Sequence, residues 1–282
     1  MNEFLDIVKD TLIDGLKLLP FLFITFILME LLEHKFGDKL NNKLKKVNKI
    51  GPIFGSLLGI IPQCGISASA SNFYITRVIS LGTLISVYLS TSDEMLPILI
   101  GHNVSIILIV KILLVKFITG LVFGFIIDLI FRKKETEDIK DFCELEDCDC
   151  NHGVLKSSII HTLKTFLYIL IISFLLNLAM FYFGEDLLSK LLMKNNPFGV
   201  IITSLIGLIP NCSSSVLLTE LYLNDIISIG KLLSGVLVNA GVGLLILFRF
   251  NKNKKENFKI IGILLAIGVL VGFIFDILRI TF

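Results

Sequence analysis

The sequence contains no tryptophan, only 6 prolines and few charged residues for a chain of 282 residues. Charged side chains make up 18% of the chain and hydrophobic side chains 54%, and the mean hydropathy is +0.86. A soluble domain typically has about 25% charged and about 45–50% apolar residues. Because the charges also fall between long apolar runs, the sequence predicts an integral membrane protein. The sequence has no cluster of basic and aromatic residues, so it does not indicate a nucleic-acid partner.

Signatures of enzymes are also missing from the sequence. It has no His-Glu-x-x-His motif, no Gly-x-Ser-x-Gly motif and no P-loop. We therefore do not expect an enzyme. Without a nucleotide-binding segment, coupling to an ion gradient is the simpler source of energy for any transport.

Cysteine is present in an odd number, 5, which does not suggest the disulfide framework of a small secreted protein. Two of the cysteines follow a proline in the middle of an apolar run, in Ile61-Pro62-Gln63-Cys64 and in Ile209-Pro210-Asn211-Cys212. Proline breaks or kinks a helix. In lipid, the freed backbone is tolerated only where protein or a water-filled cavity covers it. The two breaks therefore indicate a site inside the membrane.

The two proline–cysteine segments belong to a longer internal repeat with a constant offset of 148 residues. The matched pairs include Ser56/Ser204, Gly59/Gly207, Pro62/Pro210, Cys64/Cys212, Ser80/Ser228, Gly82/Gly230, Gly124/Gly272 and Asp128/Asp276. Apolar matches are common by chance in a membrane protein, but matched Pro, Cys, Gly and Asp are not. The sequence predicts an internal duplication.

The distribution of lysine predicts that the two halves have inverted topology. The segment 34–49 is basic and 101–103 is not, whereas in the second half 184–196 is mixed in sign and 249–255 is basic. Basic loops face the cytoplasm, so equivalent loops face opposite sides. We expect a multi-pass cell-membrane protein whose N-terminus and C-terminus both lie outside.

The predicted fold is an all-α polytopic membrane protein with two inverted repeats of about five helical segments each. Its parts are a first transmembrane repeat (1–133), an acidic cytoplasmic loop (134–153) and a second repeat (154–282). Each half has a hairpin of two short helices that meet at the proline, near the membrane midplane. An arm of about 11 residues measures roughly 16 Å, half the hydrocarbon core, so the hairpin is either re-entrant or two shortened spans.

The predicted substrate site lies between the two hairpin tips, where small polar residues surround the thiols. Its residues are Gln63, Cys64, Ser67, Asn211, Cys212, Ser213 and Ser215. Facing thiols suit a soft metal or metalloid, with Cys64 and Cys212 as ligands. The alternative is that each cysteine packs as a small hydrophobic residue.

Three carboxylates are candidates for coupling because an ionisable group at membrane depth is costly and usually functional. They are Asp93 and Glu94, which occur in the first half alone, and Glu220, which lies on an otherwise apolar helix face. The alternative is that these carboxylates are solvated at a membrane surface.

A second metal-binding candidate is the cysteine-containing part of the central loop. Its ligands would be Cys143, Cys148, Cys150 and His152, a set that suits a soft or borderline divalent ion but fits no standard zinc module. The alternative is a disordered acidic linker. Apart from a transition-metal ion, as substrate or in this loop, we expect no cofactor.

The segments Ile61-Pro62-Gln63-Cys64-Gly65, Ile79-Ser80-Leu81-Gly82-Thr83-Leu84 and Ser90-Thr91-Ser92-Asp93-Glu94 resemble the ten-span heavy-metal exporters. These are relatives of the arsenic-efflux permeases and are also labelled manganese transporters. The resemblance implies efflux of a metal or metalloid, with the hairpin cysteines and the Asp-Glu pair as site residues. The second half departs from the family: it has Val238-Asn239-Ala240-Gly241 where a glycine-rich or histidine-bearing motif is expected.

These observations together predict a secondary-active transporter that exports a soft metal ion or metalloid. Protons are the coupling ion that we consider. One alternative is a transporter of a small organic or inorganic anion, bound at the hairpin helix N-termini. A channel and a non-transporting membrane scaffold are further alternatives. The expected partners are a small ion or small-molecule substrate and the lipid bilayer, with a second copy of the chain as a candidate and no nucleic acid.

Overall fold

The computed structural model describes residues 8–9, 11–13, 15–20, 22–28, 50–92, 95–131, 154–183 and 198–278. Within these ranges every regular element is a helix, and none is a strand. The helices of the first half are α2 (Gly51–Gly59), α3 (Cys64–Ile75), α4 (Leu81–Ser90), α5 (Met95–Gly101) and α6 (Ile106–Phe131). Those of the second half are α8 (Val154–Phe183), α10 (Gly199–Gly207), α11 (Cys212–Leu223), α12 (Ile229–Val238), α13 (Val242–Phe250) and α14 (Lys254–Ile277). The prediction of an all-α polytopic protein is confirmed.

The prolines divide the apolar runs as predicted. Helices α2 and α10 have 9 residues each, and α3 and α11 have 12 residues each. The next span of each half is also broken. Helix α4 ends before Thr91, and α12 is separated from α13 by 239–241, where Gly241 has a φ of 52°. A side chain is strained at this positive φ, so glycine allows the chain to turn there.

The local structure repeats with the sequence. Helices α2, α3 and α4 begin and end 148 residues before α10, α11 and α12, the same separation as between the two proline-linked cysteines. The N-caps Ser80 and Ser228 both accept a hydrogen bond from the backbone N–H three residues later. Arg77 and Asp225, which follow the hairpins, have left-handed φ values of 65° and 62°. The inversion of the halves and the boundaries of the three parts remain predictions.

Small residues allow the helices of each half to approach closely. Helix α4 packs between α2 and α6, and α12 packs between α10 and α14. At Gly207 in α10, an added Cβ would lie 2.1 Å from the carbonyl oxygen of Gly235 in α12. Interfaces of this kind, with glycine and serine at the contact, are typical of helices packed in membranes.

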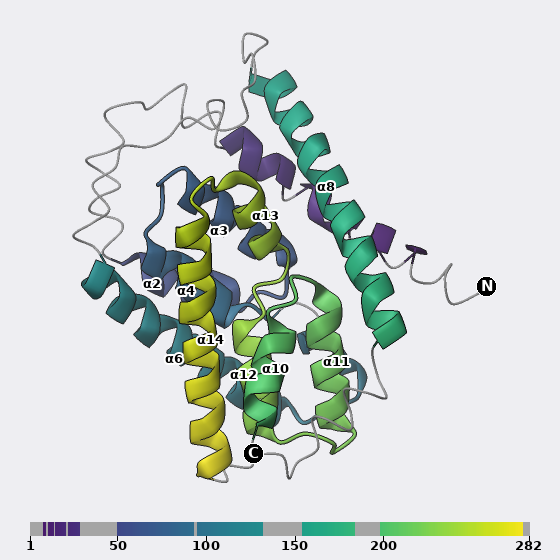
Figure 1. Ribbon diagram of the computed structural model, residues 1–282, viewed down its shortest axis with the longest axis vertical. Helices are drawn as coiled ribbons and strands as arrows, with labels where there is room; N and C mark the ends of the chain where they lie inside the picture. The colour runs from purple at the N-terminus through teal and green to yellow at the C-terminus, as the bar shows by residue number, and fades with distance from the viewer. Residues whose placement is uncertain are drawn as a thin grey trace.

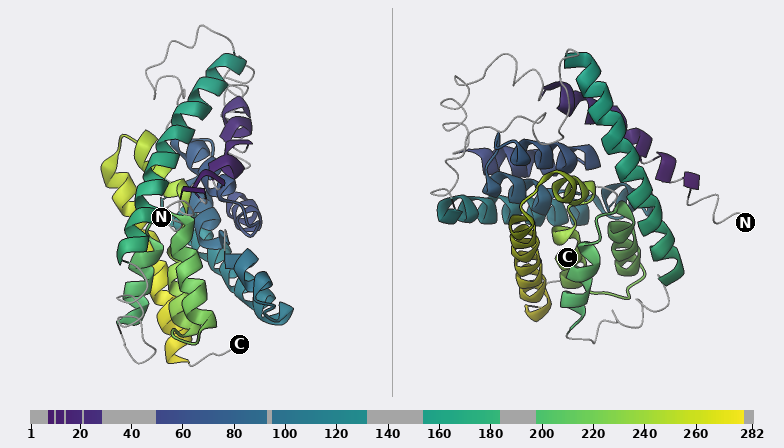
Figure 2. Two further views of the ribbon diagram at one scale, coloured as in Figure 1. Left: turned by 90° about the vertical axis from the view of Figure 1, so that its right-hand side faces the viewer. Right: turned by 45° about the horizontal axis from the view of Figure 1, so that its top comes forward.

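The second helix of each hairpin packs on a helix of the other half. Helix α3 of the first half packs on α13 of the second, and α11 of the second half packs on α5 of the first. Each hairpin is therefore packed against the other half. At the second tip Asn211 and Cys212 are buried, whereas at the first tip Gln63 and Cys64 are half-buried. Figures 1 and 2 show α8 as a long helix along one side of the molecule, beside the N-terminal helical segment.

Among the residues that the structure describes, five helical segments are long and apolar enough to cross a membrane: Thr11–Leu28, Ile106–Phe131, Ser158–Leu178, Ile229–Phe250 and Lys254–Ile277. The segment formed by α12 and α13 is 94% buried, whereas that of α6 is 28% buried. The outer helices thus expose apolar side chains to lipid, and the broken span α12–α13 lies in the centre.

Candidate functional site

The two proline-linked cysteines meet. Cys64 is the first residue of α3 and Cys212 the first residue of α11, and their sulfur atoms are 3.4 Å apart. A disulfide bond measures about 2.05 Å, so the two sulfurs are in contact without being bonded. Cys212 is buried and Cys64 is half-buried. The structure therefore brings together the two thiols that the sequence places 148 residues apart.

Each tip has the same backbone geometry because the same residues precede it. Gln63 and Asn211 are the extended N-caps of α3 and α11, with φ values of −153° and −147°, and neither side chain caps its helix. The first backbone N–H groups of a helix point towards its N-terminus, which carries partial positive charge. Two such helix ends converge on the thiols, so the site favours negative charge on sulfur or on a bound group.

The serines of the first turn are bonded to their own helices. Ser67 Oγ donates to the carbonyl oxygen of Cys64, and Ser215 Oγ donates to that of Cys212, both at 2.8 Å. The hydroxyl oxygens keep acceptor capacity for a ligand or water. Ser67 and Ser215 thus lie one helical turn from the thiols.

The tip of α11 is also held by α8. Asn211 Nδ2 donates to Asn177 Oδ1 at 2.5 Å, and Ser213 Oγ donates to the same oxygen. Asn177 Nδ2 in turn donates to Thr11 Oγ1 at 2.9 Å. Sequence reasoning did not identify Asn177, although an asparagine between Leu176 and Leu178 in an apolar span was a usable signal.

The tip of α3 has a weaker counterpart of this arrangement. Thr25 Oγ1 and Ser69 Oγ lie 2.5 Å apart, and Gln63 Nε2 lies 3.5 Å from the carbonyl oxygen of Lys17. The second distance is long for a hydrogen bond. The N-terminal helical segment thus contacts the first tip as α8 contacts the second.

Glu220 is not at the thiols. It lies eight residues further along α11 than Cys212, about 12 Å away along a helix. Its carboxylate pairs with His102 Nε2 of the α5 end at 3.0 Å, and both side chains are partly exposed. The structure thus places Glu220 near one end of the helix pair formed by α5 and α11.

The other predicted coupling and metal residues lie outside the described residues. These are Asp93, Glu94, Cys143, Cys148, Cys150 and His152. Within the part of the chain that the structure describes, no group of three or more His, Cys, Asp or Glu side chains could hold a metal ion.

The duplicated aspartates have structural partners. Asp128 accepts hydrogen bonds from Ser80 Oγ and from the backbone N–H of Gly82, both at 2.8 Å. Asp276 accepts from Ser228 Oγ at 2.5 Å. A carboxylate at a helix N-terminus is favourable, so these side chains fasten α6 and α14 to the starts of α4 and α12.

Arg77, which follows the first hairpin, donates to Glu256 of α14 from Nη1 at 2.9 Å and from Nη2 at 3.3 Å. Burial by itself lowers the pKa of Arg77. The hydrogen bond and charge of Glu256 outweigh this and leave the pKa above its ordinary value. The guanidinium therefore remains charged and links the end of the first hairpin to the second half.

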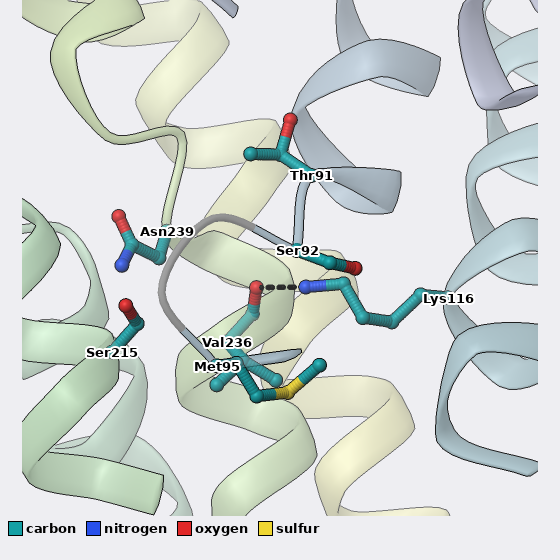
Figure 3. Close-up of a pocket in the computed structure, with 7 residues that line it drawn as sticks. All are labelled: Thr91, Ser92, Met95, Lys116, Ser215, Val236 and Asn239. Carbon is teal, nitrogen blue, oxygen red and sulfur yellow. Dashed lines mark hydrogen bonds between the residues drawn. The ribbon is translucent and has the colours of Figure 1, made fainter. Parts of the chain in front are cut away.

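A small cavity lies between the two broken spans (Figure 3), with about the volume of one water molecule. Its lining residues are Thr91, Ser92, Met95, Lys116, Ser215, Val236 and Asn239. Lys116 of α6 is 1% exposed, and its Nζ donates to the carbonyl oxygen of Val236 at 2.8 Å. Sequence reasoning missed Lys116. A lysine within a 26-residue span of hydropathy 2.6 was the available signal.

Comparisons with known proteins agree with this architecture. Curated proteins and solved structures gave no match to the chain. A family model matches residues 3–187, which is more than half of the chain, and its family is provisionally described as 10TM heavy-metal exporters. The match includes the first hairpin, its cysteine and the first broken span. The chain therefore belongs to the family of 10TM heavy-metal exporters.

Proposed function

We propose that this chain is a secondary-active transporter that exports a soft metal ion or metalloid, and that it binds its cargo between Cys64 and Cys212. The observation that supports this most directly is the 3.4 Å separation of the two sulfurs. With metal–sulfur bonds of about 2.3 Å, two thiolates are about 3.8 Å apart around a tetrahedral centre and about 4.6 Å apart around a linear one. The tips need to separate by only about 0.4 Å for the tetrahedral case.

The electrostatics of the tips favour the same cargo. A divalent cation bound by two thiolates forms a neutral unit, which lowers the cost of placing charge at membrane depth. The N-termini of α3 and α11 stabilise the thiolates before the metal arrives. Bonds from α8 and from the N-terminal segment hold both tips in position. The remaining ligands would come from water or from the hydroxyls of the first turns.

The mechanism that we propose is alternating access between two inverted halves, with N-terminus and C-terminus outside and the 134–153 loop in the cytoplasm. Discontinuous helices that meet near the midplane are characteristic of such transporters. Protons are the proposed exchanged ion, with Asp93, Glu94 and Glu220 as the carboxylates that carry them. The thiols of the 134–153 loop load or sense cargo. No chemical conversion of the cargo is proposed.

The test is metal flux into proteoliposomes for the double variant Cys64→Ser/Cys212→Ser, with cadmium and arsenite as separate probes. We expect a loss of flux of at least about tenfold, since one lost metal–thiolate bond costs more than the 1.4 kcal/mol that equals tenfold. A second variant, Cys143→Ser/Cys148→Ser/Cys150→Ser, keeps the tips and removes the loop thiols, so it measures the contribution of the loop separately. Unchanged flux of both probes in the double variant, with normal folding, would remove the thiol role.

A second candidate function is transport of a small anion. The specific observation in its favour is that two helix N-termini without side-chain caps converge on one place. Flux of oxyanions or small organic acids that is insensitive to thiol-blocking reagents would favour it. Conductance far above transporter turnover would instead indicate a channel, and absence of any flux a scaffold.

A further inference from the structure

The buried amine of Lys116 lies at the C-terminal end of a discontinuous helix. Helix α12 ends at Val238, so the carbonyl group of Val236 is among the last four and has no partner within the helix. Lys116 Nζ donates to this carbonyl oxygen at 2.8 Å (Figure 3). The C-terminal end of a helix carries partial negative charge. An ammonium group in contact with it therefore occupies the position that a bound cation would take.

The surroundings of the ammonium group are suited to a cation. The C-caps of both broken helices, Thr91 after α4 and Asn239 after α12, line the cavity together with Ser92 and Ser215. Neutral oxygen ligands suit hard cations. In transporters built from broken helices, unwound backbone and half-helix C-termini coordinate Na⁺ or H⁺.

The corresponding place in the other half is filled. The residue 148 positions before Val236 is Tyr88, and the residue 148 positions after Lys116 is Leu264. Tyr88 is fully buried and its hydroxyl lies 2.7 Å from Ser71 Oγ. Its ring lies 2.9 Å from where a Cβ on Gly243 would be. Gly243 corresponds to the cavity-lining residue Met95, so in the first half the Tyr88 ring packs against the equivalent position, and Leu264 brings no charge.

The cavity is connected directly to the thiol site. Ser215 lines the cavity, and its hydroxyl donates to the carbonyl oxygen of Cys212 at 2.8 Å. Asn239 Nδ2 donates to Ser214 Oγ at 3.2 Å. Ser214 is the neighbour of Ser215 in the first turns of α11. A displacement of the α11 tip on cargo binding would therefore alter the oxygen atoms around the ammonium group.

We propose that the ammonium group of Lys116 is a tethered cation, bound at the C-terminal end of α12, that takes the place of a dissociable alkali-metal coupling ion. Among the described residues that line the cavity, Lys116 is the one ionisable side chain. Asp93 and Glu94 lie between the lining residues Ser92 and Met95 in the sequence. The cation site follows from the geometry alone, and its link to transport rests on the proposed function.

The experiment removes the tether and asks whether a free cation replaces it. Wild type, Lys116→Ala and the matched control Leu264→Ala are purified, and their melting temperatures are measured in choline, sodium, lithium and methylammonium chloride. We expect the same melting temperature for wild type in all four salts. Lys116→Ala should melt lower in choline and rise by about 2–4 °C in at least one small cation, present at roughly ten times its Kd. Leu264→Ala should show no dependence on the cation.

Flux gives the second measurement. Wild-type proteoliposomes should transport cadmium in buffers without alkali-metal ions. Lys116→Ala should lose most flux in choline and regain at least about fivefold with the cation that raises its melting temperature. A wild-type requirement for sodium or potassium would overturn the proposal, as would a folded Lys116→Ala whose stability is the same in all salts.

The outcomes separate this proposal from the thiol site. If the Lys116→Ala protein aggregates in choline chloride, it is instead extracted from the membrane in the presence of each of the other salts. Recovery of monodisperse protein by a small cation then supports the proposal, and aggregation in every salt contradicts it. If neither the wild type nor any variant transports cadmium or arsenite, the proposed cargo is wrong. The melting temperatures still test the cation site in that case.

Discussion

Oxidation should join the two halves of the protein through Cys64 and Cys212. Their sulfur atoms are 3.4 Å apart and must approach by about 1.4 Å to reach the length of a disulfide bond. Each cysteine is the first residue of a short helix that follows a proline break. We expect mild oxidants such as copper phenanthroline or diamide to form the bond in the folded protein.

The size of the effect follows from the loop that the bond would close. The two cysteines are 148 residues apart, and the chain-entropy model gives about 5 kcal/mol of stabilisation for a loop of about 150 residues. The oxidised protein should therefore melt at a higher temperature than the reduced protein. It should also lose transport, because the tips can no longer separate to admit a metal, and reductant should restore both properties.

The assay uses a variant without the loop thiols, Cys143→Ser/Cys148→Ser/Cys150→Ser, with a protease site inserted within 134–153. After oxidation and cleavage, the two fragments should migrate together on a gel without reductant and separate when reductant is added. Bound cadmium should slow the cross-linking, because the metal occupies both sulfurs. The same protein with Cys64→Ser is the control that cannot form the bond.

Two outcomes would refute the reasoning. One is separation of the fragments without reductant after oxidation of a folded sample, which would mean that the tips do not meet in solution. The other is efficient cross-linking that leaves cadmium and arsenite flux unchanged. In that case the tips meet, but their separation is not part of the transport cycle.

Two further predictions concern the packing that holds the tips. Gly207→Ala should destabilise the protein by about 1–3 kcal/mol through overpacking, because the new Cβ would lie 2.1 Å from the carbonyl oxygen of Gly235. Gly262→Ala meets nothing within 4 Å and should change the melting temperature little, so equal destabilisation by both substitutions would contradict the packing argument. Asp128→Ala removes the acceptor of the Gly82 backbone N–H and should cost roughly 1–3 kcal/mol for that buried donor. A melting curve unchanged from wild type would show that the carboxylate does not hold the start of α4.

Much of the fold was predictable because the signals are local. Pro62 and Pro210 interrupt a helix whatever the tertiary surroundings, and the helices break at these two positions as the sequence predicts. The duplication was visible from matched residue types, and its helices begin and end at matched positions. The break after α12 was harder to place. It depends on Gly241 at positive φ and on Asn239, whose side chain accepts from the Gly241 backbone N–H at 2.9 Å.

The candidate site was predictable only in part. The sequence singled out the thiols because both follow a proline, and their contact followed from the expected meeting of the two hairpins. Asn177 and Lys116 were missed because neither belongs to a motif: each is one of several scattered polar residues in a long apolar helix. Such a residue reveals its partner only after the helices are packed. Glu220 was predicted to be a coupling carboxylate, and only the structure shows its partner, His102 at 3.0 Å, towards the end of α11 opposite Cys212.

The sequence by itself determined the membrane class, the helical breaks and the repeated halves, because hydropathy, proline and residue identity act over a few residues along the chain. Only the tertiary structure decided the distances between the side chains of the site and the partners of the buried polar residues. It placed the sulfurs of Cys64 and Cys212 at 3.4 Å and the Lys116 amine at 2.8 Å from the Val236 carbonyl oxygen. These distances depend on how α3 packs on α13 and α11 on α5. Contacts between residues more than a hundred positions apart are set by the shape of packed helices, which no local pattern contains.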